Sequence, residues 1–213
     1  MTSALPSSGL YAVTDSQLIP AQALAEDVAQ AIAGGACLIQ YRDKQHSLPE
    51  RKRAAARLLR LCEQQGVPLI INDDVELARE TGADGVHLGR HDASISEARE
   101  RLGATAIIGA SCYNRLESAV AAARAGASYI AFGRFFPSHS KPDAVQADLE
   151  LLTQARAQLD LPIAAIGGIT PENGRQLVEA GANLLAVIHG VFGQADIEAA
   201  ARRYADCFRT LAI

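Results

Sequence analysis

The feature that most constrains the fold is a regular alternation of two kinds of segment. Short aliphatic runs recur along the 213 residues, and each is followed by an alanine-rich stretch with helical spacing. Strands that alternate with helices form right-handed βαβ units around a parallel sheet. The predicted strands are Leu10–Thr14, Cys37–Arg42, Pro68–Asn72, Asp84–Leu88, Ala106–Ser111, Ser128–Phe132, Pro162–Ile166 and Asn183–Ile188.

The dipeptide Gly-Ala punctuates this alternation four times, at Gly35, Gly82, Gly126 and Gly181, with intervals of 47, 44 and 55 residues. Each copy closes a predicted helix, where a C-terminal glycine is typical, and opens every second strand. A βαβα unit repeated four times favours a closed (β/α)8 barrel over an open doubly wound sheet. We therefore predict an α/β chain whose residues 1–213 form a single TIM-barrel domain with parallel strands.

Composition supports this class and excludes others. Hydrophobic residues make up 49% and charged residues 21% of the chain, which is typical of a globular protein. The net charge of −4 argues against a general binder of nucleic acid or anionic membranes. The basic run Arg51–Arg53, with Arg57 and Arg60, has no aromatic residues between its members, so we interpret it as a solvated helix face.

Compartment is predicted from three further features. The four cysteines have no C-x-x-C spacing, and reduced thiols are the simplest interpretation. The N-terminal residues lack the basic and apolar regions of a secretory signal. No apolar run approaches the roughly 20 residues that span a bilayer. These features predict a cytoplasmic protein.

Polar residues gather where the predicted strands end, and in a TIM barrel these ends carry the active site. Charged, amide, hydroxyl and glycine residues follow all eight strands, whereas the strand beginnings offer little comparable. The segments are Thr14-Asp15, Gln40–Lys44, Asn72–Asp74, Gly89–Asp92, Ser111, the loop with Ser138, Ser140 and Lys141, Gly167-Gly168, and Ile188–Gly190.

This mixture of groups indicates phosphorylated substrates. Arg42, Lys44 and Lys141 supply cationic donors for phosphate oxygens. Gly167-Gly168 precedes a predicted helix, as in a backbone phosphate cradle, and a short helix near residues 189–192 would complete it. Asp73 and Asp92 follow neighbouring strands and together would hold Mg²⁺, which commonly takes one or two carboxylates plus substrate phosphates.

Each signal has a structural alternative. The glycine pair is equally compatible with a tight turn, and Asp74 is interpreted as a helix N-cap. Asp43, between two cations, fits a local salt bridge better than a metal site. His46 and His139 lie in predicted loops, where we expect solvent exposure. His87 and His91 straddle a strand end and do not form the helical pair of a zinc site.

Taken in order, these motifs resemble the thiamine phosphate synthase family along nearly the whole chain. The most specific are Gln40-Tyr-Arg-Asp-Lys44 and Phe136-Pro-Ser-His-Ser-Lys141. The others are Tyr11-Ala-Val-Thr-Asp15, Ile70-Ile-Asn-Asp-Asp74, Gly85-Val-His-Leu-Gly89 with Asp92, Gly109-Ala-Ser111, Phe132-Gly133 and Ala165-Ile-Gly-Gly-Ile169.

The resemblance implies a TIM-barrel transferase with Mg²⁺ as cofactor and two phosphorylated substrates. Thiamine phosphate and pyrophosphate would form from 4-amino-2-methyl-5-pyrimidinylmethyl pyrophosphate and 4-methyl-5-(2-phosphoethyl)thiazole. Asp73 and Asp92 would hold the metal, and Arg42, Lys44 and Lys141 would be catalytic. The pyrimidine pyrophosphate would contact Gln40, Arg42, Lys44, Asn72, Ser111 and Lys141, and the thiazole phosphate would contact Ser138, Ser140, Gly168, Val187, Ile188 and His189.

The implied chemistry needs no general base, because the thiazole nitrogen is already a nucleophile. The cations and Mg²⁺ would stabilise charge on the departing pyrophosphate, and the Arg134–Gln146 loop would be a lid. The sequence departs from the family at Arg134-Phe135, where Pro-Ile or Pro-Val is usual. It also departs at Ser138 and Ser140, where threonines are usual, and at His189, where serine is usual.

Three rival functions remain to be weighed. A thiazole tautomerase shares the barrel but needs neither metal nor pyrophosphate residues, which this chain retains. Another phosphate-binding isomerase or lyase would need a catalytic acid and base, and no such pair stands out. A non-catalytic binder of thiamine precursors would not need leaving-group residues. The sequence leaves a homo-oligomer open.

Overall fold

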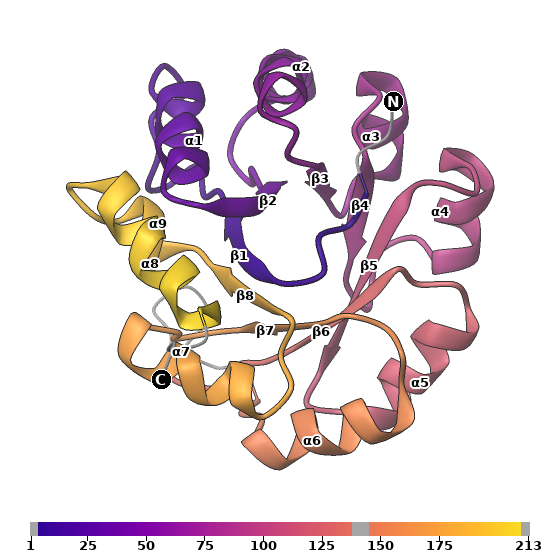
Figure 1. Ribbon diagram of the computed structural model, residues 1–213. Coiled ribbons are helices and arrows are strands. Elements are labelled where there is room, and N and C mark those ends of the chain that lie inside the picture. Colours follow the sequence, from indigo (N-terminus) through magenta and orange to yellow (C-terminus); the bar gives the residue numbers. More distant parts are fainter. Residues whose placement is uncertain (1–3, 138–144, 210–213) are drawn as a thin grey trace.

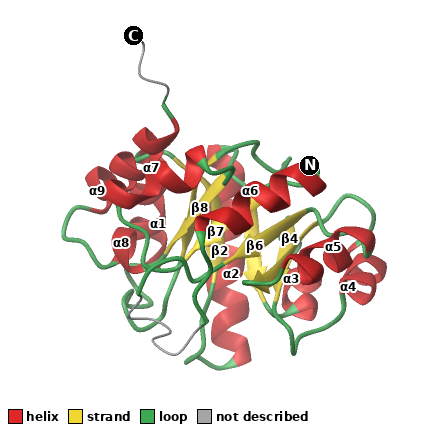
Figure 2. Ribbon diagram, turned by 90° about the horizontal axis from the view of Figure 1, so that it is seen from below, coloured by secondary structure: helices red, strands yellow, loops and turns green. Residues whose placement is uncertain are grey.

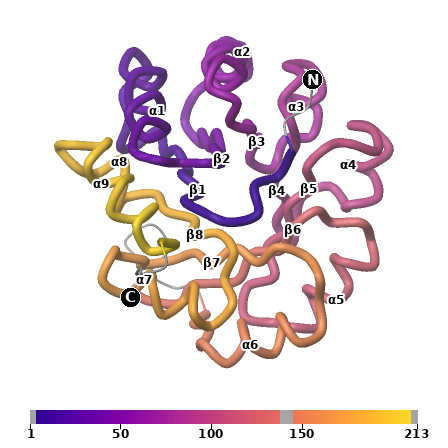
Figure 3. Tube along the Cα trace, viewed as in Figure 1, coloured from indigo at the N-terminus to yellow at the C-terminus, as the bar shows by residue number. Residues whose placement is uncertain are grey.

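Eight parallel strands close into a barrel, with each strand bonded to the next and β8 bonded back to β1. The structure is a computed structural model that describes residues 4–137 and 145–209. Figure 1 looks into the ring of strands, and Figure 3 shows the first strand beside the last. The strands are β1 Gly9–Val13, β2 Ala36–Tyr41, β3 Leu69–Asn72, β4 Gly85–Leu88, β5 Ile107–Tyr113, β6 Tyr129–Phe132, β7 Ile163–Ile166 and β8 Leu184–Val187.

Helices surround this barrel on the outside, as Figures 1 and 2 show. Seven of them follow strands in the order predicted, and α8 and α9 come after the last strand. Within the described residues, no helix combines the length and apolar character needed to cross a bilayer. The helices are α1 Leu24–Ala33, α2 Leu48–Gln65, α3 Val75–Thr81, α4 Ile95–Leu102, α5 Leu116–Arg124, α6 Leu149–Gln158, α7 Pro171–Glu179, α8 His189–Phe192 and α9 Ile197–Ala205.

The predicted TIM barrel is confirmed, and all eight strands lie where the aliphatic runs placed them. The four Gly-Ala glycines have φ values of 75–120°, the left-handed region that glycine adopts without strain. Each of them links a helix to β2, β4, β6 or β8, as the repeat predicted. The strand bounds differ from the prediction by one or two residues. For example, β8 ends before Ile188 because that residue begins the turn into α8.

Side-chain alternation along the strands divides the core into two layers. On β1, Leu10 and Ala12 pack outward beneath the helices, while Tyr11 and Val13 point into the barrel. The inner layer is closed by aliphatic and tyrosine side chains from most of the strands. Its buried members are Tyr11, Val13, Leu38, Ile70, Ile107, Tyr129, Ala131, Ala164, Leu184 and Ala186.

Helix starts are set by short polar side chains. Asp74 caps α3 by accepting the amide N–H of Leu77 at 2.9 Å, which confirms its predicted role as an N-cap. Ser47 and Ser94 form capping boxes with Glu50 and Glu97 at the starts of α2 and α4. These caps fix where each βα loop ends, and therefore where the polar groups on it lie.

The basic run at the start of α2 is only partly a solvated face. Arg51 pairs with Asp74 at 3.3 Å, and Lys52 pairs with Glu80. Both partners lie at or near α3, so these two cations tie neighbouring helices together. Arg53 and Arg60 are exposed, as predicted for the rest of the run.

Close packing of β4 against β5 generates a stability prediction. A Cβ atom on Gly85 would lie 1.8 Å from the carbonyl oxygen of Ile107, which is backbone and has little freedom to move. We expect Gly85→Ala to lower the free energy of unfolding by about 3 kcal/mol or more. Gly82→Ala is the control, because a Cβ there meets open space and incurs only the cost of φ 75°, about 1 kcal/mol. Urea unfolding of the two variants measures the difference, and equal costs would contradict the packing argument.

Candidate active site

The carboxyl ends of the strands open into a cavity of about 830 Å³. Of the predicted site residues, Gln40, Arg42, Asn72, Ser111, Gly168, Val187, Ile188 and His189 line it. Lys44, Asp73 and Asp92 form a cluster on neighbouring βα loops instead of lining this space. Ser138, Ser140 and Lys141 lie outside the described residues, as does much of the predicted Arg134–Gln146 lid.

Arg42 is held at the cavity by groups that follow β1. Its guanidinium Nη1 lies 2.8 Å from Asp15 Oδ2. Its backbone N–H donates to Thr14 Oγ1 at 2.9 Å, and Thr14 Oγ1 donates back to the Arg42 carbonyl at 3.2 Å. Thr14 and Asp15 are buried. The cation therefore lies in a fixed position, which suits it to bind an anionic group with little loss of side-chain entropy.

A second group of charges consists of Lys44, Asp73 and Asp92. The Lys44 ammonium pairs with Asp73 Oδ2, and the Asp73 and Asp92 carboxyls interact through a hydrogen bond. Asp73 has φ 63°, an unusual conformation for a residue other than glycine. Its backbone N–H donates to the His87 carbonyl at 2.8 Å, which holds it there. Strained backbone of this kind concentrates at functional sites.

The two carboxyls affect each other's ionisation. Burial raises the pKa of Asp92, and the hydrogen bond with Asp73 and the Asp73 charge raise it further. Burial also acts to raise the pKa of Asp73, but its bonds to Lys44 and Asp92 outweigh that and lower it. Asp92 Oδ2 also accepts the Gly89 N–H at 2.6 Å. Two carboxyls this close compete for one proton, and a bound cation would relieve the repulsion between them.

The donor set fits Mg²⁺. Magnesium is a hard cation that takes oxygen ligands, usually one or two carboxylates with water and substrate phosphate completing the sphere. Asp73 and Asp92 provide two such carboxylates beside a cavity. In the part of the chain that the structure describes, no group of three or more His, Cys, Asp or Glu side chains is arranged to hold a metal. These two residues therefore provide a partial ligand set that suits a metal shared with substrate.

The glycine pair after β7 is more than a tight turn. Gly168 has φ 64°, and a Cβ there would lie 2.3 Å from the Pro137 carbonyl oxygen. The Phe136 N–H donates to the Gly167 carbonyl at 3.0 Å, so the segment after β6 crosses directly over the pair. Asn173 on α7 binds the Gly168 carbonyl through Nδ2 at 3.1 Å. Glycine is required here because another chain segment approaches the backbone closely.

His189 stands at the first position of α8, where the cavity continues beyond β8. Gly190 beside it leaves room for Tyr204, because a Cβ on Gly190 would lie 2.0 Å from the Tyr204 hydroxyl. That hydroxyl donates to the Ile169 carbonyl at 3.0 Å, linking α9 to the glycine segment after β7. The backbone around Gly168 and His189 is thus held as one unit at one side of the cavity.

Sequence reasoning missed three residues in the barrel interior, namely Tyr11, His87 and Tyr129. Tyr11 and His87 line the cavity, and Tyr129 is fully buried directly behind it. His87 Nε2 lies 2.9 Å from Ser111 Oγ, which is one of the predicted substrate contacts. The signal that would have found them is the period-two alternation, because each points inward on its strand like Ser111 on β5.

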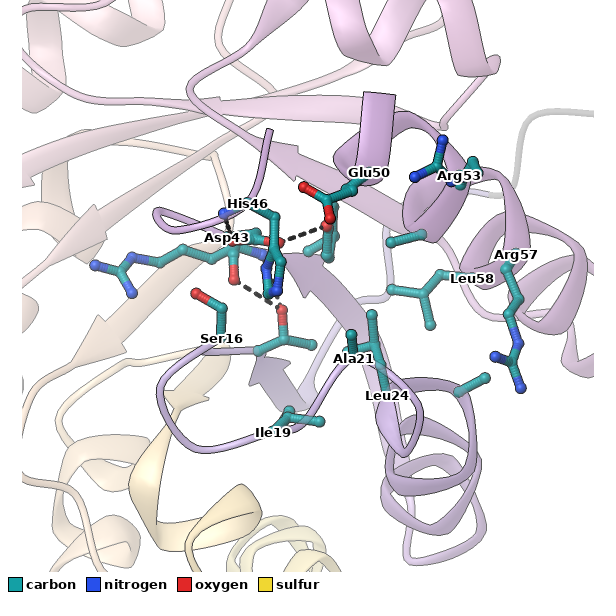
Figure 4. A pocket seen from close by; sticks show the side chains of 15 residues that line it. Ser16, Ile19, Ala21, Leu24, Asp43, His46, Glu50, Arg53, Arg57 and Leu58 are labelled. Carbon is teal, nitrogen blue, oxygen red and sulfur yellow. Dashed lines mark hydrogen bonds and ion pairs between the residues drawn. The ribbon is translucent and has the colours of Figure 1, made fainter. Parts of the chain in front are cut away.

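A smaller cavity of about 340 Å³ lies outside the barrel between the loops after β1 and β2 and helices α1 and α2. Figure 4 shows its apolar wall, formed by side chains such as Ile19, Leu24 and Leu58, and the Asp43–His46 pair at its polar end. The predicted pyrophosphate and thiazole residues do not gather here, apart from Arg42. The barrel mouth is therefore the candidate active site.

The Asp43–His46 pair corrects two expectations. His46 is not freely solvent-exposed, because its Nδ1 lies 2.8 Å from Asp43 Oδ2 and only 33% of its side chain is accessible. Asp43 does have a local partner, as predicted, but it is the His46 ring and not the adjacent Arg42 or Lys44. Those two cations pair with Asp15 and Asp73 across the strands. The loop after β2 lies between the loops after β1 and β3, so its two cations have an acid within reach on either side.

The fold and this geometry define a (β/α)8-barrel protein whose candidate active site gathers cations, carboxylates and glycine backbone at the carboxyl ends of the strands. Residues 10–191 match the family described as thiamine monophosphate synthase. The chain belongs to that family.

Individual relatives agree with this assignment. A thiamine-phosphate synthase of Nitrosococcus oceani is 57% identical over 200 residues, which cover 94% of this chain and 92% of the relative. The enzyme of the same name from Alcanivorax borkumensis is 50% identical, covering 95% and 94%. Among solved structures, thiamine phosphate pyrophosphorylase from Pyrococcus furiosus superposes with a TM-score of 0.86 at 34% identity, covering 94% and 95%. The predicted family is confirmed.

The environment of Asp43 generates a pH-dependent prediction. Burial would raise its pKa, but the N–H groups of Gln45 and His46, with Tyr41 and the His46 ring, donate to the carboxylate and lower it to about 2, from 3.8. The folded pKa lies below the unfolded one, so this stabilisation is present above about pH 4 and is lost as pH falls toward 2. We expect Asp43→Asn to cost about 2 kcal/mol at pH 7, and the cost to shrink across that window. Urea unfolding from pH 7 down to 2 measures it.

The matched control for this experiment is Asp160→Asn, at an exposed position between α6 and β7. Its cost should be small compared with that of Asp43→Asn at pH 7, since surface substitutions usually change stability little. A cost for Asp43→Asn that stays constant between pH 7 and 2 would show that the carboxylate charge does not stabilise this loop.

Proposed function

We propose that the protein is a Mg²⁺-dependent transferase that joins 4-amino-2-methyl-5-pyrimidinylmethyl pyrophosphate to 4-methyl-5-(2-phosphoethyl)thiazole. The products are thiamine phosphate and pyrophosphate. The observation that carries this proposal is the charge cluster of Lys44, Asp73 and Asp92 on βα loops, with Arg42, two residues before Lys44, lining the cavity. Two carboxylates and two cations at one opening suit a magnesium pyrophosphate, which needs both ligands for the metal and donors for its own oxygens.

The reaction breaks the bond between the pyrimidinylmethyl carbon and the pyrophosphate oxygen, and the electron pair leaves with pyrophosphate. The lone pair of the thiazole nitrogen then forms the new carbon–nitrogen bond. Arg42 and Lys44 stabilise the negative charge that develops on the leaving group, and the resemblance assigns Lys141 the same task. Mg²⁺, when held by Asp73 and Asp92, supplies further positive charge at the leaving group. No general base is needed.

The aminopyrimidine is assigned to the inner part of the cavity, where Gln40, Asn72 and Ser111 provide amide and hydroxyl groups. All three come from strands and are therefore more rigidly held than loop residues. Precise placement matters here, because the second substrate must reach the methylene carbon as pyrophosphate departs.

The thiazole phosphate is assigned to the other side of the cavity. Gly168 and the Val187–His189 segment line it there, and the resemblance adds Ser138 and Ser140. The φ of 64° at Gly168 and its close contact with Pro137 support a rigid backbone surface at this position. Here His189, in place of the family's usual serine, would donate to phosphate from its ring.

The alternative is a thiazole tautomerase built on the same barrel. That activity uses thiazole phosphate alone and has no need of the Arg42–Asp15 pair or the Lys44–Asp73–Asp92 cluster. The arrangement of these groups therefore favours the synthase.

Turnover with both purified substrates tests the proposal directly. We expect thiamine phosphate and pyrophosphate in equal amounts, and only when Mg²⁺ is present. Asp73→Ala should reduce turnover by about 10²–10³-fold, since it removes charge stabilisation at the leaving group. We expect a loss of similar size for Lys141→Ala. Glu117→Ala is the control and should leave turnover unchanged, because its side chain is 82% exposed on α5, away from the cavity.

Two outcomes would overturn the assignment. The first is a folded enzyme that binds the thiazole phosphate but releases no pyrophosphate, which would favour the tautomerase. The second is full turnover by Asp73→Ala in the presence of Mg²⁺, which would remove the metal role given to the carboxylate pair.

A further inference from the structure

Five side chains form a continuous hydrogen-bonded chain across the inside of the barrel. Gln40 Nε2 lies 2.5 Å from the Tyr11 hydroxyl, which lies 2.7 Å from the Tyr129 hydroxyl. The Tyr129 hydroxyl lies 2.9 Å from His87 Nδ1, and His87 Nε2 lies 2.9 Å from Ser111 Oγ. The five residues come from β2, β1, β6, β4 and β5, so the chain spans the barrel and does not follow one edge.

The packing around this chain holds its rings in place. The Tyr11 and Tyr129 rings meet edge to face, with centroids 5.9 Å apart and planes at 82°. Gly109 faces the Tyr129 ring, and a Cβ atom there would lie 2.1 Å from Tyr129 Cζ. Tyr129 therefore reaches the centre of the barrel only because residue 109 is glycine. Burial raises the pKa of both phenols well above its usual value, so both carry their protons at neutral pH.

The end of the chain at Gln40 determines its direction. An amide nitrogen only donates, so the Tyr11 hydroxyl accepts from Gln40. Among the described residues, the other hydrogen-bond partner of the Tyr11 hydroxyl is Tyr129, and Tyr11 is 1% exposed. A buried hydroxyl proton without an acceptor is costly, so Tyr11 donates to Tyr129. The Tyr129 hydroxyl therefore accepts from Tyr11. Its own proton is donated to His87 Nδ1.

This direction fixes the chemical state of the groups that face the cavity. With Nδ1 accepting from Tyr129, the ring proton of His87 lies on Nε2 and is donated to Ser111 Oγ. Ser111 then has its own proton left to donate. At the opposite end, the Gln40 amide is oriented by one of its two N–H groups, which donates to Tyr11, and its oxygen remains an acceptor. Gln40 and Ser111 both line the cavity.

We propose that this hydrogen-bonded chain orients the Gln40 oxygen to accept and the Ser111 hydroxyl to donate toward the substrate, with His87 and Tyr129 as positioning residues that hold this polarity. The proposal rests on the proposed function and extends it to specificity. A 4-aminopyrimidine offers an amino group that can donate to the Gln40 oxygen and an unprotonated ring nitrogen that can accept from Ser111. A 4-hydroxypyrimidine in its oxo form offers a carbonyl oxygen and a ring N–H instead, so we expect it to pair less well with these two groups.

The first test examines the free protein and needs no activity. In the full chain labelled with ¹⁵N-histidine, we expect His87 to have a protonated Nε2 and an unprotonated Nδ1 in two-bond ¹H–¹⁵N spectra. The protein has five histidines, so the signals of His87 are assigned by their loss in the His87→Gln variant. A proton on Nδ1, or rapid exchange between the two tautomers, would overturn the proposed polarity.

The second test measures specificity. We expect the wild-type enzyme to prefer the 4-amino pyrophosphate over its 4-hydroxy analogue by about 100-fold or more in kcat/KM. Tyr129→Phe keeps the ring but removes the hydroxyl that links Tyr11 to His87, and we expect this preference to fall by about tenfold. The KM for the thiazole phosphate should not change, because Tyr129 is fully buried and does not line the cavity as Gly168 and His189 do.

Tyr41→Phe is the matched control. Its hydroxyl is also on a barrel strand and is also hydrogen-bonded, to Asp43 at 3.0 Å, but it lies outside the barrel. The control should keep the wild-type preference for the amino substrate. An unchanged preference in Tyr129→Phe would overturn the positioning role. If the wild-type protein makes no thiamine phosphate, the proposed function fails, and the histidine spectra still decide the polarity of the chain.

Discussion

The period-two alternation of side chains around a closed parallel barrel is the constraint on which the rest of this structure depends. Because the sheet has no edge, every strand must send alternate residues into one narrow interior and the others beneath the helices. The space inside the barrel is filled by these inward side chains, so each strand contributes its own share of the interior. Toward the carboxyl ends these inward positions are Gln40, Asn72, His87 and Ser111, and each must find a partner or face the cavity.

The closed barrel also explains how charges are arranged at its mouth. The loops that follow neighbouring strands lie side by side there, so the cations on one loop reach acids on the loops to either side. Arg42 pairs with Asp15 after β1, while Lys44 pairs with Asp73 after β3. Asp43, between them, is left to order the loop through His46. One five-residue motif thereby supplies two anchored cations and the carboxylate that shapes the loop carrying one of them.

Local signals were enough to predict the barrel and most of its strand ends. Aliphatic runs and Gly-Ala junctions are properties of single segments, and so is the N-cap role of Asp74. The hydrogen bonds that link Tyr11, Tyr129 and His87 were not predictable in this way. They depend on which inward positions lie at the same height, and that is set by the register between strands such as β5 and β6. A single sequence does not show this register, although the family resemblance implied that Gln40 and Ser111 contact the same substrate.

Glycine at the inward and crossing positions links the stability of the barrel to its site. At Gly109 the missing side chain makes room for Tyr129, and at Gly168 it makes room for the backbone of Phe136 and Pro137. In both places a side chain on the glycine would occupy the position of a group that lies beside the cavity. The interior therefore passes from aliphatic packing around Leu38 and Ile70 to a hydrogen-bonded layer, and then to open cavity. The polar layer closes the core and forms the floor of the site at once, so a change that loosens it would affect both folding and substrate recognition.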